Sequence, residues 1–201
     1  MAEKLKLELL QGETFVRVIR WGALPHVYKA ITAITQAAPA AITSTAHGLA
    51  TGWPVAVVSV LGMTEINAKN SPPRLNEYLQ ATVVDANTIT LNTVNSAEYA
   101  AYTSGGYLQY YTPVDMTGFA ARMTIKNRIG GTVLATLTSG APDNRIALDN
   151  AAHTVTLTIS ATDTAAFEFT SGTYDLEMVA PTGAVTRLYQ GAITISKEVT
   201  T

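Results

Sequence analysis

Apolar residues occupy every second position from Phe119 to Ile125, and the positions between them are mostly polar. Successive side chains of a β-strand point to opposite faces of its sheet, so this period of two predicts a half-buried strand. Residues 113–118 precede it and contain the Pro, Asp and Gly of a turn. The predicted inner face consists of Phe119, Ala121, Met123 and Ile125.

Short strands separated by turns are predicted along most of the chain. Turn residues recur at intervals of about 8–12 residues, which is the spacing of an all-β sandwich or barrel. Helical character is confined to about one turn over 161–167, where Ser160 is a predicted N-cap and Asp163 follows three residues later. Further clear strands are predicted at 14–21, 54–61, 154–159 and 173–179.

Composition excludes several classes of function. The chain has no cysteine, which excludes disulfides, thiol catalysis and cysteine-bound zinc. Its formal net charge is −2 and its basic residues form no stripe, so we expect no nucleic-acid partner. No stretch approaches the roughly 20 apolar residues of a membrane helix, and the first residues form no apolar leader. We therefore expect a soluble protein that is made in the cytoplasm and does not insert into a membrane.

An ordered set of segments lies at the two ends of the chain. It begins with an N-terminal strand and a turn and strand from Gly12 to Trp21, and it resumes with PVDMTGFAARMTIKN at 113–127. In this order the segments resemble the immunoglobulin-like N-terminal domain of phage baseplate upper proteins. In that family only a few residues join the strand ending at the tryptophan to the PVD-type turn. The later matching segments are 146–148, 155–165, 174–177 and 187–195.

The long stretch between Trp21 and Pro113 carries a second ordered set of motifs, which are AHGLATG at 46–52, GMTEIN at 62–67, VDANT at 84–88 and YAAYTSGG at 99–106. Together they resemble a small β-barrel module that is shared between phage structural proteins and the first catalytic-cysteine half-domain of ubiquitin-activating enzymes. The enzyme activity does not carry over, because this chain has no cysteine and no nucleotide-binding loop.

These resemblances imply a nested domain organisation. Residues 1–27 and 113–201 are expected to form a discontinuous immunoglobulin-like β-sandwich, and residues 28–112 an inserted small β-barrel. Insertion at the tip of a hairpin is physically plausible because the ends of the insert lie close together there. The cost of closing a loop also grows only slowly with its length.

Candidate catalytic and metal-binding residues lack the context that their chemistry needs. The three histidines, His26, His47 and His153, lie in separate contexts, and we expect them in turns or at the surface. Asp143-Asn144 and Asp149-Asn150 could supply oxygen ligands to calcium, but their spacing is not that of an EF-hand and Asx residues are common in turns. No serine lies in a G-x-S-x-G motif, and no carboxylate pair is recognisable as a glycosidase site. The sequence therefore predicts no catalytic site, no cofactor and no metal.

Aromatic residues of the central stretch are the best candidates for protein interaction. Tyrosine and tryptophan are enriched among the residues that contribute most to binding energy at interfaces. The alternative is that the same residues cover the seam between the two domains. The candidates are Trp53, Tyr78, Tyr107, Tyr110 and Tyr111.

The resemblances imply a non-enzymatic structural protein of a bacteriophage virion. The expected role is an adaptor in the tail tip or baseplate that anchors fibres or receptor-binding proteins. Its expected partners are other virion proteins, in a symmetric assembly of several copies. Two alternatives remain open: a head or neck component, such as a decoration or fibre-anchor protein, and a carbohydrate-binding module.

Overall fold

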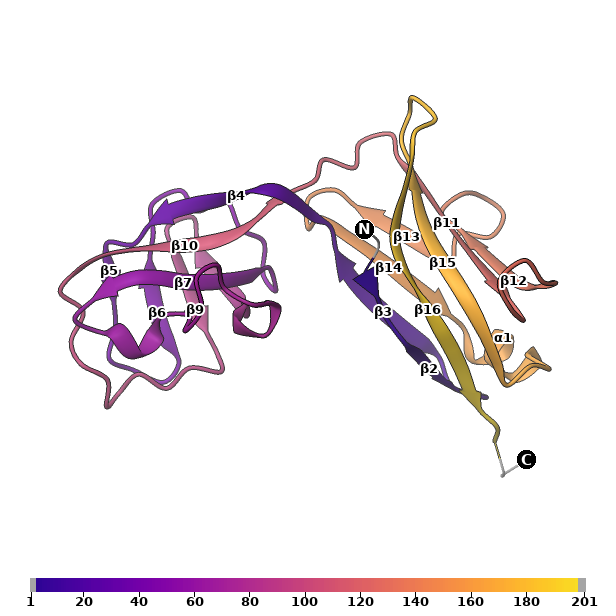
Figure 1. Ribbon diagram of the computed structural model, residues 1–201, viewed down its shortest axis with the longest axis horizontal. Coiled ribbons are helices and arrows are strands. Elements are labelled where there is room, and N and C mark those ends of the chain that lie inside the picture. Colours follow the sequence, from indigo (N-terminus) through magenta and orange to yellow (C-terminus); the bar gives the residue numbers. More distant parts are fainter. Residues whose placement is uncertain (1–2, 199–201) are drawn as a thin grey trace. The chain divides into compact units, whose positions relative to one another are not determined.

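A computed structural model describes residues 3–198, which form two compact units (Figure 1). The sandwich unit contains the described residues up to Trp21 together with those from Asp115 onward, and the inserted unit is Gly22–Val114. Both units are built mainly from strands. The predicted fold class, an all-β protein with an immunoglobulin-like sandwich and an inserted barrel-like module, is confirmed.

The sandwich unit has a six-stranded sheet and a three-stranded sheet. The larger sheet has the order β1-β16-β15-β11-β12, with β2 also beside β16, and the smaller sheet has the order β13-β14-β3. The elements are β1 (Glu3–Lys4), β2 (Leu7–Leu10), β3 (Phe15–Arg20), β11 (Ala120–Lys126), β12 (Val133–Thr138), β13 (Ile146–Asp149), β14 (Thr154–Ile159), α1 (Ala161–Ala166), β15 (Ser171–Val179) and β16 (Val185–Ser196).

Inward-facing side chains of the two sheets form one apolar core. On β11, Ala121, Met123 and Ile125 are buried, so the predicted alternation is confirmed. Val155, Leu157 and Ile159 of β14 belong to the same core. On the opposite face of β11, Arg122 forms an ion pair with Glu177 of β15 at 2.8 Å.

The first strand of the sandwich is split at Leu5. Its two parts, β1 and β2, both run parallel to β16. The Leu5 carbonyl accepts a hydrogen bond of 2.8 Å from the hydroxyl of Tyr174, which is buried in the core. Gly191 of β16 lies directly against Leu5, and a Cβ at position 191 would clash with the Leu5 carbonyl oxygen. The split therefore depends on a glycine that permits this close approach of two backbones.

The inserted unit is a seven-stranded sheet that curls into a half-barrel. Its strand order is β4-β10-β7-β8-β9-β6-β5, and its buried side chains form one apolar core. The elements are β4 (Gly22–Ala30), β5 (Ala33–Ile34), β6 (Ala40–Thr43), β7 (Pro54–Leu61), η1 (Thr64–Ile66), η2 (Leu75–Glu77), β8 (Leu79–Asp85), β9 (Thr88–Leu91) and β10 (Ser104–Pro113).

The inserted unit begins earlier than the sequence-based boundary at residue 28. Residues 22–27 form the first part of β4 and pair with β10, so they do not belong to the sandwich. Leu24 and Pro25 have no register partner in β10, because the register shifts between Tyr111 and Thr112, and the Pro25 carbonyl accepts a hydrogen bond from the Thr112 hydroxyl instead. A bulge of this kind tolerates proline, which has no N–H to donate to the ladder. The strand therefore continues through residues whose composition suggests an interruption.

Excision of the inserted unit is expected to leave a folded sandwich. Gly22 and Pro113 are register partners across β4 and β10, so the two ends of the insertion lie side by side. A short glycine-containing linker from Trp21 to Asp115 should therefore change the sandwich's free energy of unfolding by only about 1 kcal/mol, because loop closure depends weakly on length. Thermal unfolding followed by circular dichroism measures this effect.

A second variant provides the control for the excision. Removal of residues 28–112 alone keeps the first part of β4 but deletes most of its partner β10. We expect this variant to aggregate more readily, since it exposes an unpaired strand edge. Loss of cooperative unfolding in the variant that lacks all of residues 22–114 would contradict the nested organisation.

Candidate functional site

The most distinctive surface of the inserted unit is the outer face of β10 and β4. Side chains alternate along β10, so that Leu108 and Tyr110 point into the core while Tyr107 and Tyr111 lie on the opposite face. Antiparallel pairing then places β4 side chains beside them, because residues opposite each other share a face. In this register His26 is opposite Tyr111.

Six residues together form what we term the aromatic surface: His26, Tyr28, Tyr78, Tyr107, Gln109 and Tyr111. Its rings make a continuous series of contacts across the two strands. The His26 and Tyr111 ring centroids are 4.5 Å apart, and those of Tyr78 and Tyr111 are 5.7 Å apart. Tyr28 meets Tyr107 edge to face, with centroids 6.3 Å apart. Such tilted and edge-to-face pairs are the favoured aromatic geometries and hold the rings in fixed orientations.

A chain of hydrogen bonds orders the less exposed end of the aromatic surface. The Gln109 amide donates to the Tyr78 hydroxyl oxygen at 3.0 Å, and this hydroxyl lies 3.2 Å from Nε2 of His26. The Tyr78 hydroxyl therefore links the Gln109 amide to the His26 ring. Burial raises the pKa of the Tyr78 hydroxyl above its ordinary value, so ionisation is disfavoured still further.

The loop before β8 carries Tyr78 to this position. The Glu77 carboxylate accepts hydrogen bonds from the backbone N–H groups of Arg74, Lys69 and Asn70. These bonds, led by that of Arg74, hold the pKa of the Glu77 carboxyl below its ordinary value. The carboxylate thus orders a proline-containing loop and fixes the residue that follows it, Tyr78.

The other end of the aromatic surface is open to solvent. Tyr28 and Tyr107 are 55% and 46% exposed. Each combines a large apolar ring with a hydroxyl group and has few rotatable bonds, so little conformational entropy is lost when it is covered by a partner. Exposed tyrosines on an ordered base of buried polar groups are suited to binding another molecule.

Two of the five predicted interaction residues are instead core residues. Trp53 is 2% exposed and Tyr110 is 3% exposed, and both pack in the apolar core of the inserted unit. The Tyr110 hydroxyl donates to the His47 carbonyl at 2.5 Å. Burial raises the pKa of this hydroxyl above its ordinary value. Their expected place at an interaction surface is therefore corrected, because both side chains are buried in that core. The structure brings the other three, Tyr78, Tyr107 and Tyr111, together.

Sequence reasoning missed His26, Tyr28 and Gln109. The signal that could have found His26 and Tyr28 is their spacing of two, which places them on one face of a strand. The proline at position 25 obscured that strand. Gln109 has the same spacing from Tyr107 and Tyr111, but its role depends on the loop that supplies Tyr78.

The histidines have separate environments, and two of them are structural. His47 is buried, contrary to the expectation of a turn or surface position, and its Nδ1 accepts the Leu49 N–H at 3.0 Å. Its Nε2 lies 2.9 Å from the Asp85 carbonyl, to which it donates. His153 lies in a turn with a φ of 51°. Within residues 3–198, no cluster of three or more His, Cys, Asp or Glu side chains is arranged to hold a metal ion.

The Asx residues considered for calcium order turns of the sandwich unit. Asp143 accepts a hydrogen bond from the Thr138 N–H and forms an ion pair with Arg145. Asn150 accepts the Met116 N–H at 2.7 Å. Their oxygen atoms therefore act as local acceptors that close loops between strands.

Comparison with known proteins leaves the function to be inferred from the residues themselves. No protein-family model matches the chain, and no curated protein sequence is similar to it. Among the residues that the structure describes, none of the helices combines the length and the apolar character needed to cross a membrane. The aromatic surface is thus the feature on which a functional proposal can be built.

Proposed function

We propose that this chain is a non-enzymatic structural protein of a bacteriophage virion, acting as a tail-tip or baseplate adaptor that anchors fibres or receptor-binding proteins. In this proposal the aromatic surface of the inserted unit holds a neighbouring virion protein, and the sandwich unit is the scaffold. The observation that carries the proposal is the arrangement of three tyrosines and His26 on one sheet face, with Tyr78 from the loop before β8 packed against them. The two ordered sets of motifs at the ends and in the middle of the chain support the virion assignment.

The chemistry of the aromatic surface favours a protein partner. Interfaces between proteins are enriched in tyrosine and depleted of charged residues at their centres. All four tyrosines and Gln109 are uncharged, and the hydrogen-bonded base formed by Gln109, Tyr78 and His26 limits their motion before binding. A partner that covers Tyr28 and Tyr107 therefore gains apolar contact at a small entropic cost.

Carboxylates of the sandwich unit support a non-enzymatic role. Asp175 and Glu177 lie on the outer face of β15, where each is paired with an arginine. Asp175 is 3.4 Å from Arg187, and Glu177 is 2.8 Å from Arg122. Their charges therefore stabilise neighbouring strands and are not arranged as an acid and a base around a substrate.

Location in the particle tests the virion assignment directly. Antibody labelling of purified particles is expected to place the chain at the tail tip or baseplate. Labelling at the head or neck would favour the decoration or fibre-anchor alternative, and absence from particles would overturn the proposal. Specific binding of a saccharide through the same tyrosines would favour the carbohydrate-binding alternative.

Removal of the two exposed tyrosines is expected to weaken partner binding. The double change Tyr28→Ala and Tyr107→Ala should raise the dissociation constant for the neighbouring virion protein by about 10–100-fold, because such residues contribute a large share of interface energy. Cross-linking in intact particles identifies the neighbour, and calorimetry with the purified pair measures its affinity. Val84→Ala, at an exposed position of β8, is the control and should leave affinity unchanged. Equal affinity of the double variant and wild type would contradict the assignment of this surface.

A further inference from the structure

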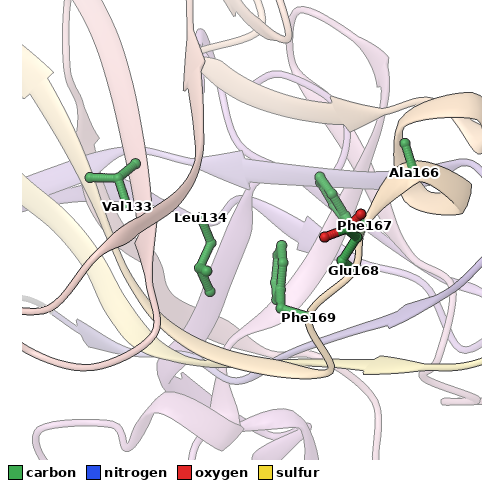
Figure 2. A pocket seen from close by; sticks show the side chains of 6 residues that line it. All are labelled: Val133, Leu134, Ala166, Phe167, Glu168 and Phe169. Atoms are coloured by element: carbon green, nitrogen blue, oxygen red, sulfur yellow. The ribbon is translucent and has the colours of Figure 1, made fainter.

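A hollow of about 450 Å³ opens at one end of the sandwich unit. Figure 2 shows the side chains around it, with Leu134 of β12 facing Phe167 and Phe169 from the segment that follows α1. The two phenylalanine rings are 4.9 Å apart at their centroids and are only partly buried. The hollow is open, and five of its six lining residues are apolar, with Glu168 as the only charged one.

An exposed apolar side chain lies a few residues before the first lining residue of this hollow along the chain. Ile129 occupies the tip of the β11–β12 hairpin and is 92% exposed, and Val133, which lines the hollow, follows four residues later. Two hydrogen bonds between Asn127 and Thr132 order the tip. The Asn127 backbone N–H donates to the Thr132 carbonyl at 3.1 Å, and the Thr132 N–H donates to the Asn127 side-chain oxygen at 2.9 Å. The protein therefore holds an isoleucine in solvent on a preformed turn, beside a hollow large enough to take it.

The charges at the two features are complementary. Arg128 precedes Ile129 at the hairpin tip, and Glu168 lies between the two phenylalanines of the hollow. Within residues 3–198, neither Arg128 nor Glu168 forms an ion pair. An isoleucine that enters a hollow of this composition would bring an arginine close to a glutamate.

We propose that the sandwich unit binds a second copy of this chain, with Ile129 of each copy in the hollow of the other and Arg128 paired with Glu168. The tip and the hollow share the β11–β12 hairpin, so one twofold axis can make both contacts at once, as an isologous interface requires. A second copy covers the tip and the hollow together.

This inference goes beyond the proposed function and does not depend on it. The dimer contact lies wholly in the sandwich unit, whereas the aromatic surface belongs to the inserted unit. A chain that stayed monomeric in solution could still bind a virion protein through its tyrosines. Failure of one proposal therefore leaves the other standing.

Sedimentation equilibrium of the full chain tests the dimer. Wild type is expected to dimerise in a concentration-dependent manner, and Ile129→Asp should raise the dimer dissociation constant by at least about tenfold, since it places a charge in an apolar hollow. Val185→Asp changes another exposed apolar residue of the same unit and should leave the dimer unchanged. Circular dichroism checks that both variants keep the wild-type fold.

Charge reversal tests the orientation of the contact. Arg128→Glu and Glu168→Arg should each weaken the dimer, because each places like charges opposite each other, and the double variant should recover most of the affinity. A wild type that is monomeric at every concentration would overturn the proposal and leave the hollow to another partner. An Ile129→Asp variant that dimerises like wild type, or a double variant without recovery, would overturn it as well.

Discussion

Replacing Trp53 with alanine is expected to lower the free energy of unfolding of the inserted unit by about 3–5 kcal/mol. Trp53 is 2% exposed and belongs to the same core as Val55 and Leu108. The change removes the largest buried side chain of this unit and leaves a cavity that the surrounding sheet can fill only in part. The effect should be confined to stability, because the side chain does not reach the surface.

The two tryptophans of the chain make this experiment selective. Trp21 belongs to the sandwich unit and Trp53 to the inserted unit, so fluorescence can report on the two units separately. In Trp53→Ala the remaining Trp21 signal should show an unchanged denaturant midpoint for the sandwich, while circular dichroism shows earlier unfolding of the inserted unit. Trp53→Phe keeps an aromatic ring in the core and should have a smaller effect.

A small loss of stability together with a loss of partner affinity would show that Trp53 is an interaction residue after all. A variant that lost less than about 1 kcal/mol of stability would not behave like a core substitution. If it also lost affinity for the partner, the tryptophan would have to reach the interface. Burial predicts that neither occurs.

Local patterns of the sequence predict individual strands well in this protein. The alternation on β11 correctly identifies Ala121, Met123 and Ile125 as core residues. Ser160 is the N-cap of α1, where its hydroxyl accepts the Asp163 N–H at 3.1 Å, as predicted. Both features depend on residues that are close in sequence, so sequence reasoning can evaluate them.

The aromatic surface is harder to predict because it depends on register between distant strands. Composition alone gives the same prediction of surface exposure for Tyr107, Tyr110 and Tyr111. Strand alternation, however, places Tyr110 on the opposite face from the other two. His26 joins them only because β4 pairs with β10 in the register that places it opposite Tyr111. A shift of one residue in the register between β4 and β10 would move every side chain of the shifted strand to the other face of the sheet. No local sequence pattern determines this register.

Alkaline unfolding of the sandwich unit is expected to depend strongly on Tyr174. Burial raises the pKa of its hydroxyl from 10.0 to about 12 in the folded protein. A pKa that is raised on folding contributes stability that is fully present below pH 10 and is lost as the pH rises through about 12. Two pKa units correspond to about 2–3 kcal/mol, which is a large part of the stability of an ordinary domain.

Tyr174→Phe isolates this contribution from those of the other tyrosines. The variant loses the hydrogen bond to the Leu5 carbonyl, so at pH 8 it should be about 1 kcal/mol less stable than wild type. It does not carry the ionising hydroxyl, so its stability should fall less between pH 10 and pH 12. The two stability curves should therefore cross at about pH 11. Denaturant unfolding at a series of pH values, followed by Trp21 fluorescence in a Trp53→Phe background, measures both curves. Parallel curves across this range would show that the hydroxyl ionises as readily in the folded sandwich as in the unfolded chain.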